Sequence, residues 1–169
     1  MAIIPVVSLV GESGAGKTTF LEKLVAELRS RNIRVGVIKH HVHDIDIDRP
    51  GKDTWRISSA GADSVAISTP TRVGLFKRMD REMDIDELAG MLGEMDIILT
   101  EGYKRGGKPK IEVSRAAHAD RLITGPVDLI AIVSDAGWDV GVPVFGLEDS
   151  AGVAGFLQAR YGVGPGRWR

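Results

Sequence analysis

The feature that most constrains this chain is a short glycine-rich segment near its start, Gly11-Glu12-Ser13-Gly14-Ala15-Gly16-Lys17-Thr18. It matches the pattern G-x-x-x-x-G-K-[ST] in full. An apolar run, residues 3–10, precedes it, and residues 17–31, with apolar side chains at helical spacing, follow it. A strand, a glycine loop and a helix in this order form the phosphate-binding loop of P-loop proteins. The segment therefore predicts a nucleotide-binding protein built on an α/β sheet.

The residue type at each position of this loop suits a bound polyphosphate. Glycine at positions 11, 14 and 16 permits backbone angles and a close approach that a Cβ would block. Successive backbone N–H groups then form a concave anion site, which the positive end of the helix dipole reinforces. We expect Lys17 to contact the β- and γ-phosphates and the Thr18 hydroxyl to bind Mg²⁺.

A carboxylate at the end of a neighbouring strand is the usual further requirement of a phosphate-bound Mg²⁺. Asp96 precedes the apolar run 97–100, and Glu101 follows it. Because ligands of open α/β sheets bind outside the carboxyl ends of the strands, we expect Glu101 near the metal. A surface-turn role for Glu101 is the alternative, and Asp96 is predicted to be a solvated residue at the opposite end of the strand.

A loop rich in histidine and aspartate, residues 39–48, follows the predicted strand 35–38. Imidazole and carboxylate groups suit transition metals, so a metal site formed by His40, His41 and His43 is one interpretation. The spacing matches no closed zinc pattern. We therefore favour the use of Lys39 and of Asp46 or Asp48 around the phosphates and Mg²⁺. Beyond this loop, Arg49 and Lys52 either contact a phosphorylated ligand or are ordinary solvated residues.

The apolar runs predict a P-loop fold of the α/β class, with a mostly parallel central sheet flanked by helices and an antiparallel hairpin as an extension. We expect one domain over residues 1–162 and a flexible tail over residues 163–169. Further strands are expected at residues 35–38, 97–100, 111–113, 129–133 and 142–145, and the hairpin at 65–68 and 73–77. Further helices are expected from a cap at Asp53 to residue 60, from a capping box at Asp84 to residue 92, and from a cap at Ser150.

Composition excludes several classes of protein. The chain has 169 residues, a formal net charge of -1 and no cysteine. A near-neutral charge predicts no general attraction to nucleic acid or to an anionic membrane, and without cysteine there are no disulfides or thiolate metal sites. The sequence shows no apolar run near the roughly 20 residues that span a bilayer. A cytoplasmic protein is the expectation.

Several motifs taken together resemble the MobB family, the accessory proteins of molybdopterin-guanine dinucleotide biosynthesis. The resemblance runs from about Ile4 to Val113 and is weak afterwards. The P-loop is shared by many families, whereas the later motifs are much more particular. The matching segments are the P-loop extended to Thr19, Lys39-His40-His41-Val42-His43-Asp44, Asp46-Ile47-Asp48-Arg49-Pro50-Gly51-Lys52-Asp53-Thr54, Thr100-Glu101-Gly102-Tyr103-Lys104 and Lys108-Pro109-Lys110-Ile111-Glu112-Val113.

The resemblance implies a homodimeric GTP-binding protein with weak GTPase activity, whose hairpin helps dimerisation. It implies a P-loop fold of the class that includes the nitrogenase iron protein and dethiobiotin synthetase. Its partners would be molybdopterin and the guanylyltransferase that joins GMP to molybdenum-bound molybdopterin. The sequence lacks the Asn-Lys-x-Asp guanine motif. Asp135, after the strand at 129–133, is a candidate acceptor for guanine N–H groups, with loop capping as the alternative.

Three other interpretations remain open at this point. A small-molecule kinase would use Arg49, Lys52 or Lys104 to bind an acceptor. A metallochaperone NTPase would use the histidine loop. A scaffold would deliver a bound nucleotide to a partner enzyme, with hydrolysis playing no part. The slow GTPase is preferred because the phosphate site is complete while no catalytic base or in-chain arginine finger is evident, although Arg72 and Arg105 are candidates for a trans-acting arginine in a dimer.

Overall fold

The computed structural model describes residues 4–41, 48–117 and 121–165. The chain divides into two compact units, one formed by residues 1–40 and 85–169 and the other by residues 41–84. The expectation of one domain over residues 1–162 stays a prediction. Asp44, Asp46 and His43, which the sequence singled out, lie outside the described residues.

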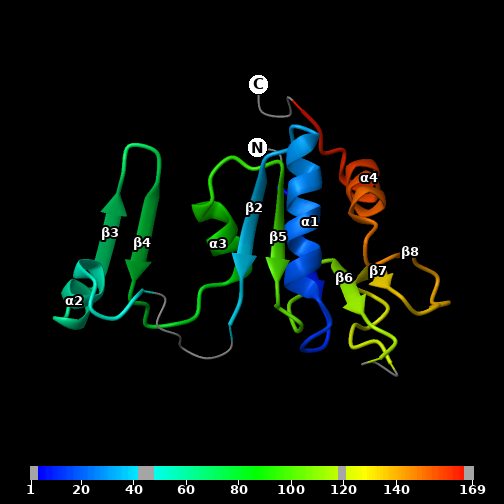
Figure 1. Cartoon of the computed structure of the whole chain (residues 1–169), viewed down its shortest axis with the longest axis horizontal. Coiled ribbons are helices and arrows are strands. Elements are labelled where there is room, and N and C mark those ends of the chain that lie inside the picture. The colour runs from blue at the N-terminus through cyan, green and yellow to red at the C-terminus, as the bar shows by residue number, and fades with distance from the viewer. Residues whose placement is uncertain (1–3, 42–47, 118–120, 166–169) are drawn as a thin grey trace. The chain divides into compact units, whose positions relative to one another are not determined.

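A six-stranded parallel sheet forms the centre of the first unit (Figure 1). The order of its strands is β2-β5-β1-β6-β7-β8. Every residue of β1, β5, β6 and β7 is buried, as expected of strands covered on both faces. The parallel sheet predicted from the apolar runs is therefore confirmed. The strands are β1 (Val6–Val10), β2 (Val35–Lys39), β5 (Ile97–Glu101), β6 (Lys110–Ser114), β7 (Leu129–Ser134) and β8 (Val144–Phe145).

Helices cover both faces of this sheet. Side chains of a strand alternate between its faces, and Val7 and Val6 accordingly belong to two different apolar clusters. The cluster of Val7 contains residues of α1 (Lys17–Ser30) and α4 (Ser150–Tyr161), and that of Val6 contains residues of α3 (Ile85–Met91). The fold class predicted from the sequence is thus the one observed.

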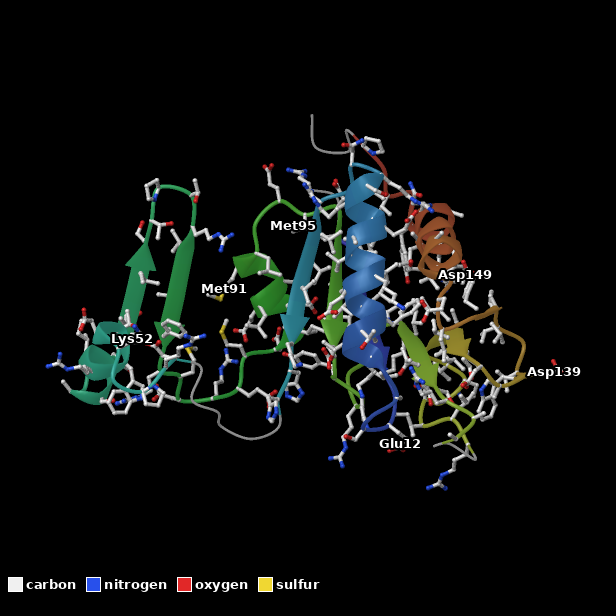
Figure 2. The ribbon with its side chains drawn as sticks, viewed as in Figure 1. Glu12, Lys52, Met91, Met95, Asp139 and Asp149 are labelled. Carbon is white, nitrogen blue, oxygen red and sulfur yellow. The ribbon has the colours of Figure 1, made fainter. Side chains whose placement is uncertain are left out.

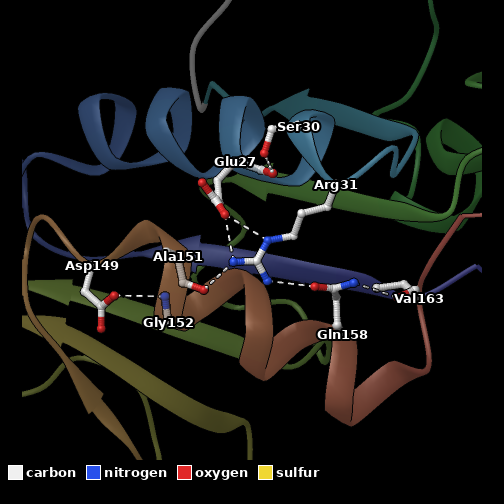
Figure 3. A network of polar contacts seen from close by, with 8 residues as sticks. All are labelled: Glu27, Ser30, Arg31, Asp149, Ala151, Gly152, Gln158 and Val163. Atoms are coloured by element: carbon white, nitrogen blue, oxygen red, sulfur yellow. Dashed lines mark hydrogen bonds and ion pairs between the residues drawn. The ribbon is translucent and has the colours of Figure 1, made fainter.

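A polar network joins the two helices that share a face (Figure 3). The Arg31 guanidinium, just after α1, donates from Nε to Glu27 Oε1 at 2.8 Å and from Nη1 to Gln158 Oε1 at 2.7 Å. Nη2 donates to the carbonyl oxygen of Ala151 at 3.0 Å. One side chain therefore contacts both the first and the last turns of α4.

The ends of α4 differ from the sequence-based expectation. The residue that caps its start is Asp149, whose Oδ1 accepts from the Gly152 N–H at 2.8 Å, so the prediction of Ser150 as the cap is wrong. An aspartate one residue earlier satisfies the same unpaired N–H groups. Beyond the helix, Val163, assigned to the flexible tail, is 3% exposed and packs in the core.

The second unit holds a helix, α2 (Asp53–Ser59), and the antiparallel hairpin of β3 (Ser64–Ser68) and β4 (Val73–Lys77). The predicted hairpin is confirmed. The cap at Asp53 is not, because α2 starts at that residue and Lys52 precedes it without a side-chain cap bond. Three large apolar side chains of the hairpin are exposed: Ile67, Val73 and Leu75.

Candidate nucleotide-binding site

The glycine-rich loop lies between the end of β1 and the start of α1, the position that the sequence predicted. Its glycines at 14 and 16 have φ angles of 79° and 91°, in the left-handed region that favours glycine. Gly11 is held against β6: a Cβ built on it would lie 2.2 Å from the carbonyl oxygen of Val113. Ala15 is buried, whereas Glu12 is exposed at the tip of the loop (Figure 2).

The Lys17 side chain turns back over this loop. Its Nζ donates to the carbonyl oxygens of Gly11 at 3.2 Å and Glu12 at 2.8 Å. Partial burial, followed by repulsion from Lys104, lowers the pKa of Lys17 below its ordinary value, and attraction to Glu101 opposes that change. The ammonium thus lies among neutral carbonyls and charges of both signs, and an added anion would favour its protonated form.

A hydroxyl, a carboxylate and an ammonium meet beside the loop. Thr18 Oγ1 donates to Glu101 Oε1 at 2.8 Å, and Lys39 Nζ lies 3.4 Å from Glu101 Oε2. Lys39 and Glu101 are paired neighbours at the carboxyl ends of β2 and β5. The structure therefore brings together Thr18, Glu101 and Lys39, as the sequence led us to expect.

Asp96 differs from its prediction in one respect. It stands before β5, at the end opposite Glu101, as expected, but it is only 3% exposed and not solvated. Its Oδ2 accepts from the Arg34 N–H at 2.7 Å and lies 3.6 Å from Arg34 Nε. A buried carboxylate requires such partners, and the apolar run beside it gives no sign of them in the sequence.

The other predicted carboxylate of the metal site, Asp48, belongs to the second unit. Its Oδ1 accepts from the Arg49 N–H at 2.8 Å, and it lines a pocket of about 450 Å³ together with Trp55, Phe76 and Arg78. Its contribution to a Mg²⁺ site stays a prediction.

The histidine loop shows packing at its first histidine, His40. The ring of His40 stacks on that of Tyr103 with centroids 4.3 Å apart, and a Cβ on Gly102 would lie 3.1 Å from His40 Cβ. The described residues contain no group of three or more histidine, cysteine, aspartate or glutamate side chains able to hold a metal ion. His40 thus acts as a packing partner of the turn after β5.

The side of the loop next to β6 and β7 holds Asp135, the predicted base contact, and one residue that the sequence analysis missed. Asp135 Oδ1 accepts from the Ala116 N–H at 2.8 Å, and Asp135 itself is exposed. The half-buried Arg115 donates from Nε to the carbonyl oxygen of Ala15 at 3.2 Å. The sequence did contain a signal for Arg115, which follows the end of an apolar strand. Ligands of a parallel sheet bind at the carboxyl ends of its strands.

These features define a class. A parallel sheet whose first strand leads through a glycine loop into a helix, with Lys17 over the loop and a Thr18–Glu101 pair beside it, is the P-loop NTPase fold. No helix within the described ranges is both long and apolar enough to cross a membrane.

Comparison with known proteins narrows the class to one family. The family described as "MobB: Molybdopterin guanine dinucleotide synthesis protein B" matches residues 6–135, and the chain belongs to this family. The resemblance therefore extends beyond Val113, where the sequence motifs had become weak.

Relatives match most of the chain. The "Molybdopterin-guanine dinucleotide biosynthesis adapter protein" of Escherichia coli (strain K12) is 35% identical over 161 residues, which cover 92% of both chains. The "Probable molybdopterin-guanine dinucleotide biosynthesis adapter protein" of Bacillus subtilis (strain 168) is 32% identical over 88% of this chain and 89% of its own. The crystal structure of Bacillus subtilis MobB has a TM-score of 0.75 at 30% identity, with 92% and 97% covered.

Proposed function

We propose that this protein binds GTP with Mg²⁺, hydrolyses it slowly, and serves as an adapter in the synthesis of molybdopterin-guanine dinucleotide. The observation that carries the nucleotide part is the loop itself: a glycine-rich turn at the entrance of α1 with Lys17 over it and the Thr18–Glu101 pair beside it. The adapter part follows from membership of the MobB family and from the names of the relatives.

Each residue has a role that its chemistry allows. The backbone N–H groups from Gly11 to Thr19 would hold the phosphates, Lys17 would place its charge on the β- and γ-phosphates, and Lys39 would add a second charge. Mg²⁺ prefers oxygen ligands and retains several waters. The Thr18 hydroxyl and the Glu101 carboxylate, 2.8 Å apart, are two such ligands on neighbouring elements.

Slow hydrolysis is expected because Glu101, the carboxylate beside the loop, already has a partner at each of its oxygens. Glu101 Oε1 accepts from Thr18 Oγ1, and Oε2 faces Lys39 Nζ at 3.4 Å. Both oxygens are therefore engaged, so Glu101 is poorly placed to remove a proton from an attacking water. We expect the bound nucleotide to persist, which suits an adapter better than an enzyme of high turnover.

Guanine selection is assigned to Asp135. A carboxylate can accept from guanine N1–H and its 2-amino group, and adenine offers no such pair of donors. Asp135 is exposed after β7, and its Oδ1 accepts from the Ala116 N–H, its one backbone donor among the described residues. Oδ2 is then the acceptor proposed for the base.

Calorimetric titration of GTP and ATP, with and without Mg²⁺, tests this proposal. We expect GTP to bind more tightly than ATP, Mg²⁺ to strengthen binding, and Lys17→Ala to weaken it at least about ten-fold, the equivalent of one charge-assisted contact. Lys23→Ala is the matched control, because Lys23 lies on the same helix and pairs with Glu148 at the surface.

Three results would contradict the proposal. Equal affinity of the wild type and Lys17→Ala for GTP would show that the loop does not bind the nucleotide. Steady turnover at tens per second without a partner would contradict slow hydrolysis, since kinases commonly run at about 1–100 s⁻¹. Phosphoryl transfer to a small acceptor would indicate a kinase and not an adapter.

The adapter role includes proposed partners: a second copy of the chain, the guanylyltransferase and molybdopterin, with the protein in the cytoplasm. Its test is cofactor maturation in cells lacking their own MobB. We expect wild type to restore activity of a molybdopterin-guanine dinucleotide enzyme, and Lys17→Ala to fail. Restoration by Lys17→Ala, if that variant has lost nucleotide binding, would support a scaffold role independent of the nucleotide.

A further inference from the structure

The end of β6 touches the nucleotide site at two places. Arg115 Nε donates to the carbonyl oxygen of Ala15, within the phosphate loop, at 3.2 Å. The next residue, Ala116, donates its backbone N–H to Asp135 Oδ1 at 2.8 Å. Two consecutive residues therefore contact the loop predicted to hold the phosphates and the carboxylate proposed to hold the base.

The Arg115 guanidinium lies next to the loop at Gly16. Its Nη2 is 3.3 Å, and its Nε 3.5 Å, from the position that a Cβ on Gly16 would occupy. A guanidinium is a planar group with five N–H donors, so one bond from Nε fixes the direction of the remaining donors. Within the described part of the chain, no ion pair joins Arg115 to a carboxylate, so no carboxylate there neutralises its charge beside the phosphate loop.

A third contact joins the loop to the same strand. Gly11, at the start of the loop, lies directly against Val113 of β6, with only 2.2 Å between the carbonyl oxygen and an added Cβ. The loop is thus held by the same strand end at both of its sides, through Val113 and through Arg115. A shift of the loop toward a bound polyphosphate would be transmitted to residues 115 and 116, and from there to Asp135.

We propose that Arg115 is a positioning residue that couples the phosphate loop to Asp135, so that binding of the polyphosphate and selection of the base are not independent. This inference rests on the proposed function, because it assumes that the loop binds a nucleoside triphosphate and that Asp135 contacts its base. The sequence lacks the Asn-Lys-x-Asp motif. Arg115 would instead connect the phosphate loop to Asp135, the residue proposed to bind the base.

A double-mutant cycle with base-containing and base-free ligands tests the coupling. Dissociation constants of GTP, ITP and inorganic tripolyphosphate are measured with Mg²⁺ for wild type, Asp135→Ala, Arg115→Ala and the double variant. We expect Asp135→Ala to weaken GTP binding and to leave tripolyphosphate unchanged. In the Arg115→Ala background, the factor by which Asp135→Ala raises the dissociation constant of GTP should be about five-fold smaller, a coupling typical of residues that share contacts.

The conservative variant separates charge from geometry. Arg115→Lys keeps the positive charge but not the planar fork. We expect Arg115→Ala to weaken tripolyphosphate binding and to reduce the preference for GTP over ITP, and Arg115→Lys to restore the first but not the second. Full recovery of that preference would overturn the role assigned to the guanidinium. Arg29→Ala is the matched control, because Arg29 also donates to a carbonyl oxygen, that of Ile33, at the far end of α1.

A purely structural Arg115 gives a different pattern. If Arg115→Ala weakens GTP and tripolyphosphate by the same factor, and Asp135→Ala costs the same in both backgrounds, the coupling is refuted while the proposed function stands. The proposed function itself fails if the wild type binds neither GTP nor tripolyphosphate. It also fails if Lys17→Ala binds both ligands as tightly as the wild type does. Thermal unfolding of each variant shows that it is folded under the conditions of the titration.

Discussion

At the residue scale, the contact between Gly11 and Val113 leaves no room for a side chain. Gly11 has a φ of 149°, and its Cβ would lie 2.2 Å from a backbone carbonyl oxygen that β-sheet pairing holds in place. The carbonyl belongs to β6, so relief would require the sheet itself to move. The glycine is therefore needed for the fold as well as for the ligand.

We predict that Gly11→Ala lowers the free energy of unfolding by about 3 kcal/mol, from backbone strain and overpacking together. Urea denaturation measures this change. Gly107→Ala is the matched control, since a Cβ there meets no atom within 4 Å and should change stability by less than about 0.5 kcal/mol. Equal effects of the two substitutions would show that the contact with Val113 does not constrain the loop.

The lowered pKa of Lys17 predicts a pH dependence of nucleotide binding. Burial and the nearby Lys104 disfavour the protonated side chain in the free protein, whereas a bound polyphosphate favours it. Binding should therefore take up protons, and affinity should fall as pH rises through the pKa of Lys17 in the free protein. Because that pKa is lowered, the fall begins at a lower pH than an ordinary lysine would give.

Titrations between about pH 7 and pH 10, in buffers of different ionisation enthalpy, measure the proton uptake. Lys17→Arg should abolish the dependence, because a guanidinium stays charged throughout this range. An affinity of the wild type that is constant over the same range would contradict the assignment of the titrating group to Lys17.

At the element scale, β6 shows how a strand can be buried and yet carry charge. Lys110 is 2% exposed, and its Nζ contacts Asp128 Oδ2 at 2.8 Å. Glu112, also 2% exposed, accepts from the N–H groups of Ile123 and Thr124, one with each carboxylate oxygen. Both side chains hold the segment that connects β6 to β7, and thereby the strand end that contacts the phosphate loop.

We predict that Glu112→Gln destabilises the protein by about 1.5–3 kcal/mol, because the amide nitrogen of glutamine would face one of the two N–H groups and leave it unpaired. Amide hydrogen exchange should become faster at residues 123 and 124. Glu148→Gln serves as the control, since the Glu148 side chain is 81% exposed. Unchanged exchange at 123 and 124 would show that Glu112 does not hold this segment.

The elements also show what a sequence can predict. The loop, α1 and the buried strands were identified because glycine spacing and continuous apolar runs are local signals. The helix starts at Asp53 and Ser150 were predicted one residue too late. Asp149 accepts the hydrogen bond expected of its neighbour Ser150, whereas α2 begins after Lys52 without any side-chain cap bond. Arg115 and the burial of Asp96 were missed, since each depends on a partner distant in sequence, Ala15 and Arg34 respectively.

At the scale of the whole molecule, the hairpin of the second unit carries exposed apolar side chains. Its strand β3 contacts α2 within the second unit, and Ile67, Val73 and Leu75 are exposed. Isolated two-stranded sheets are marginal in water. This agrees with the proposal that a second copy of the chain covers the hairpin.

We predict that Val73→Asp combined with Leu75→Asp shifts the protein from dimer to monomer, because burying either carboxylate in an interface is unfavourable. Sedimentation velocity at several concentrations measures the shift. Val127→Asp is the control, because Val127 is an isolated apolar residue that is 94% exposed in the first unit. A wild type that sediments as a monomer at all concentrations would rule out this assembly.

The order of the strands also limits when the protein becomes functional during its synthesis. β1 is made first, yet its neighbours in the sheet are β5 and β6, which begin at Ile97 and Lys110. Until the ribosome has released both, Gly11 has no carbonyl of Val113 beside it and Thr18 no Glu101. Gly11 and Thr18 are therefore synthesised before the residues that complete the proposed nucleotide site, so we expect a nucleotide to act on late and not on early steps of folding.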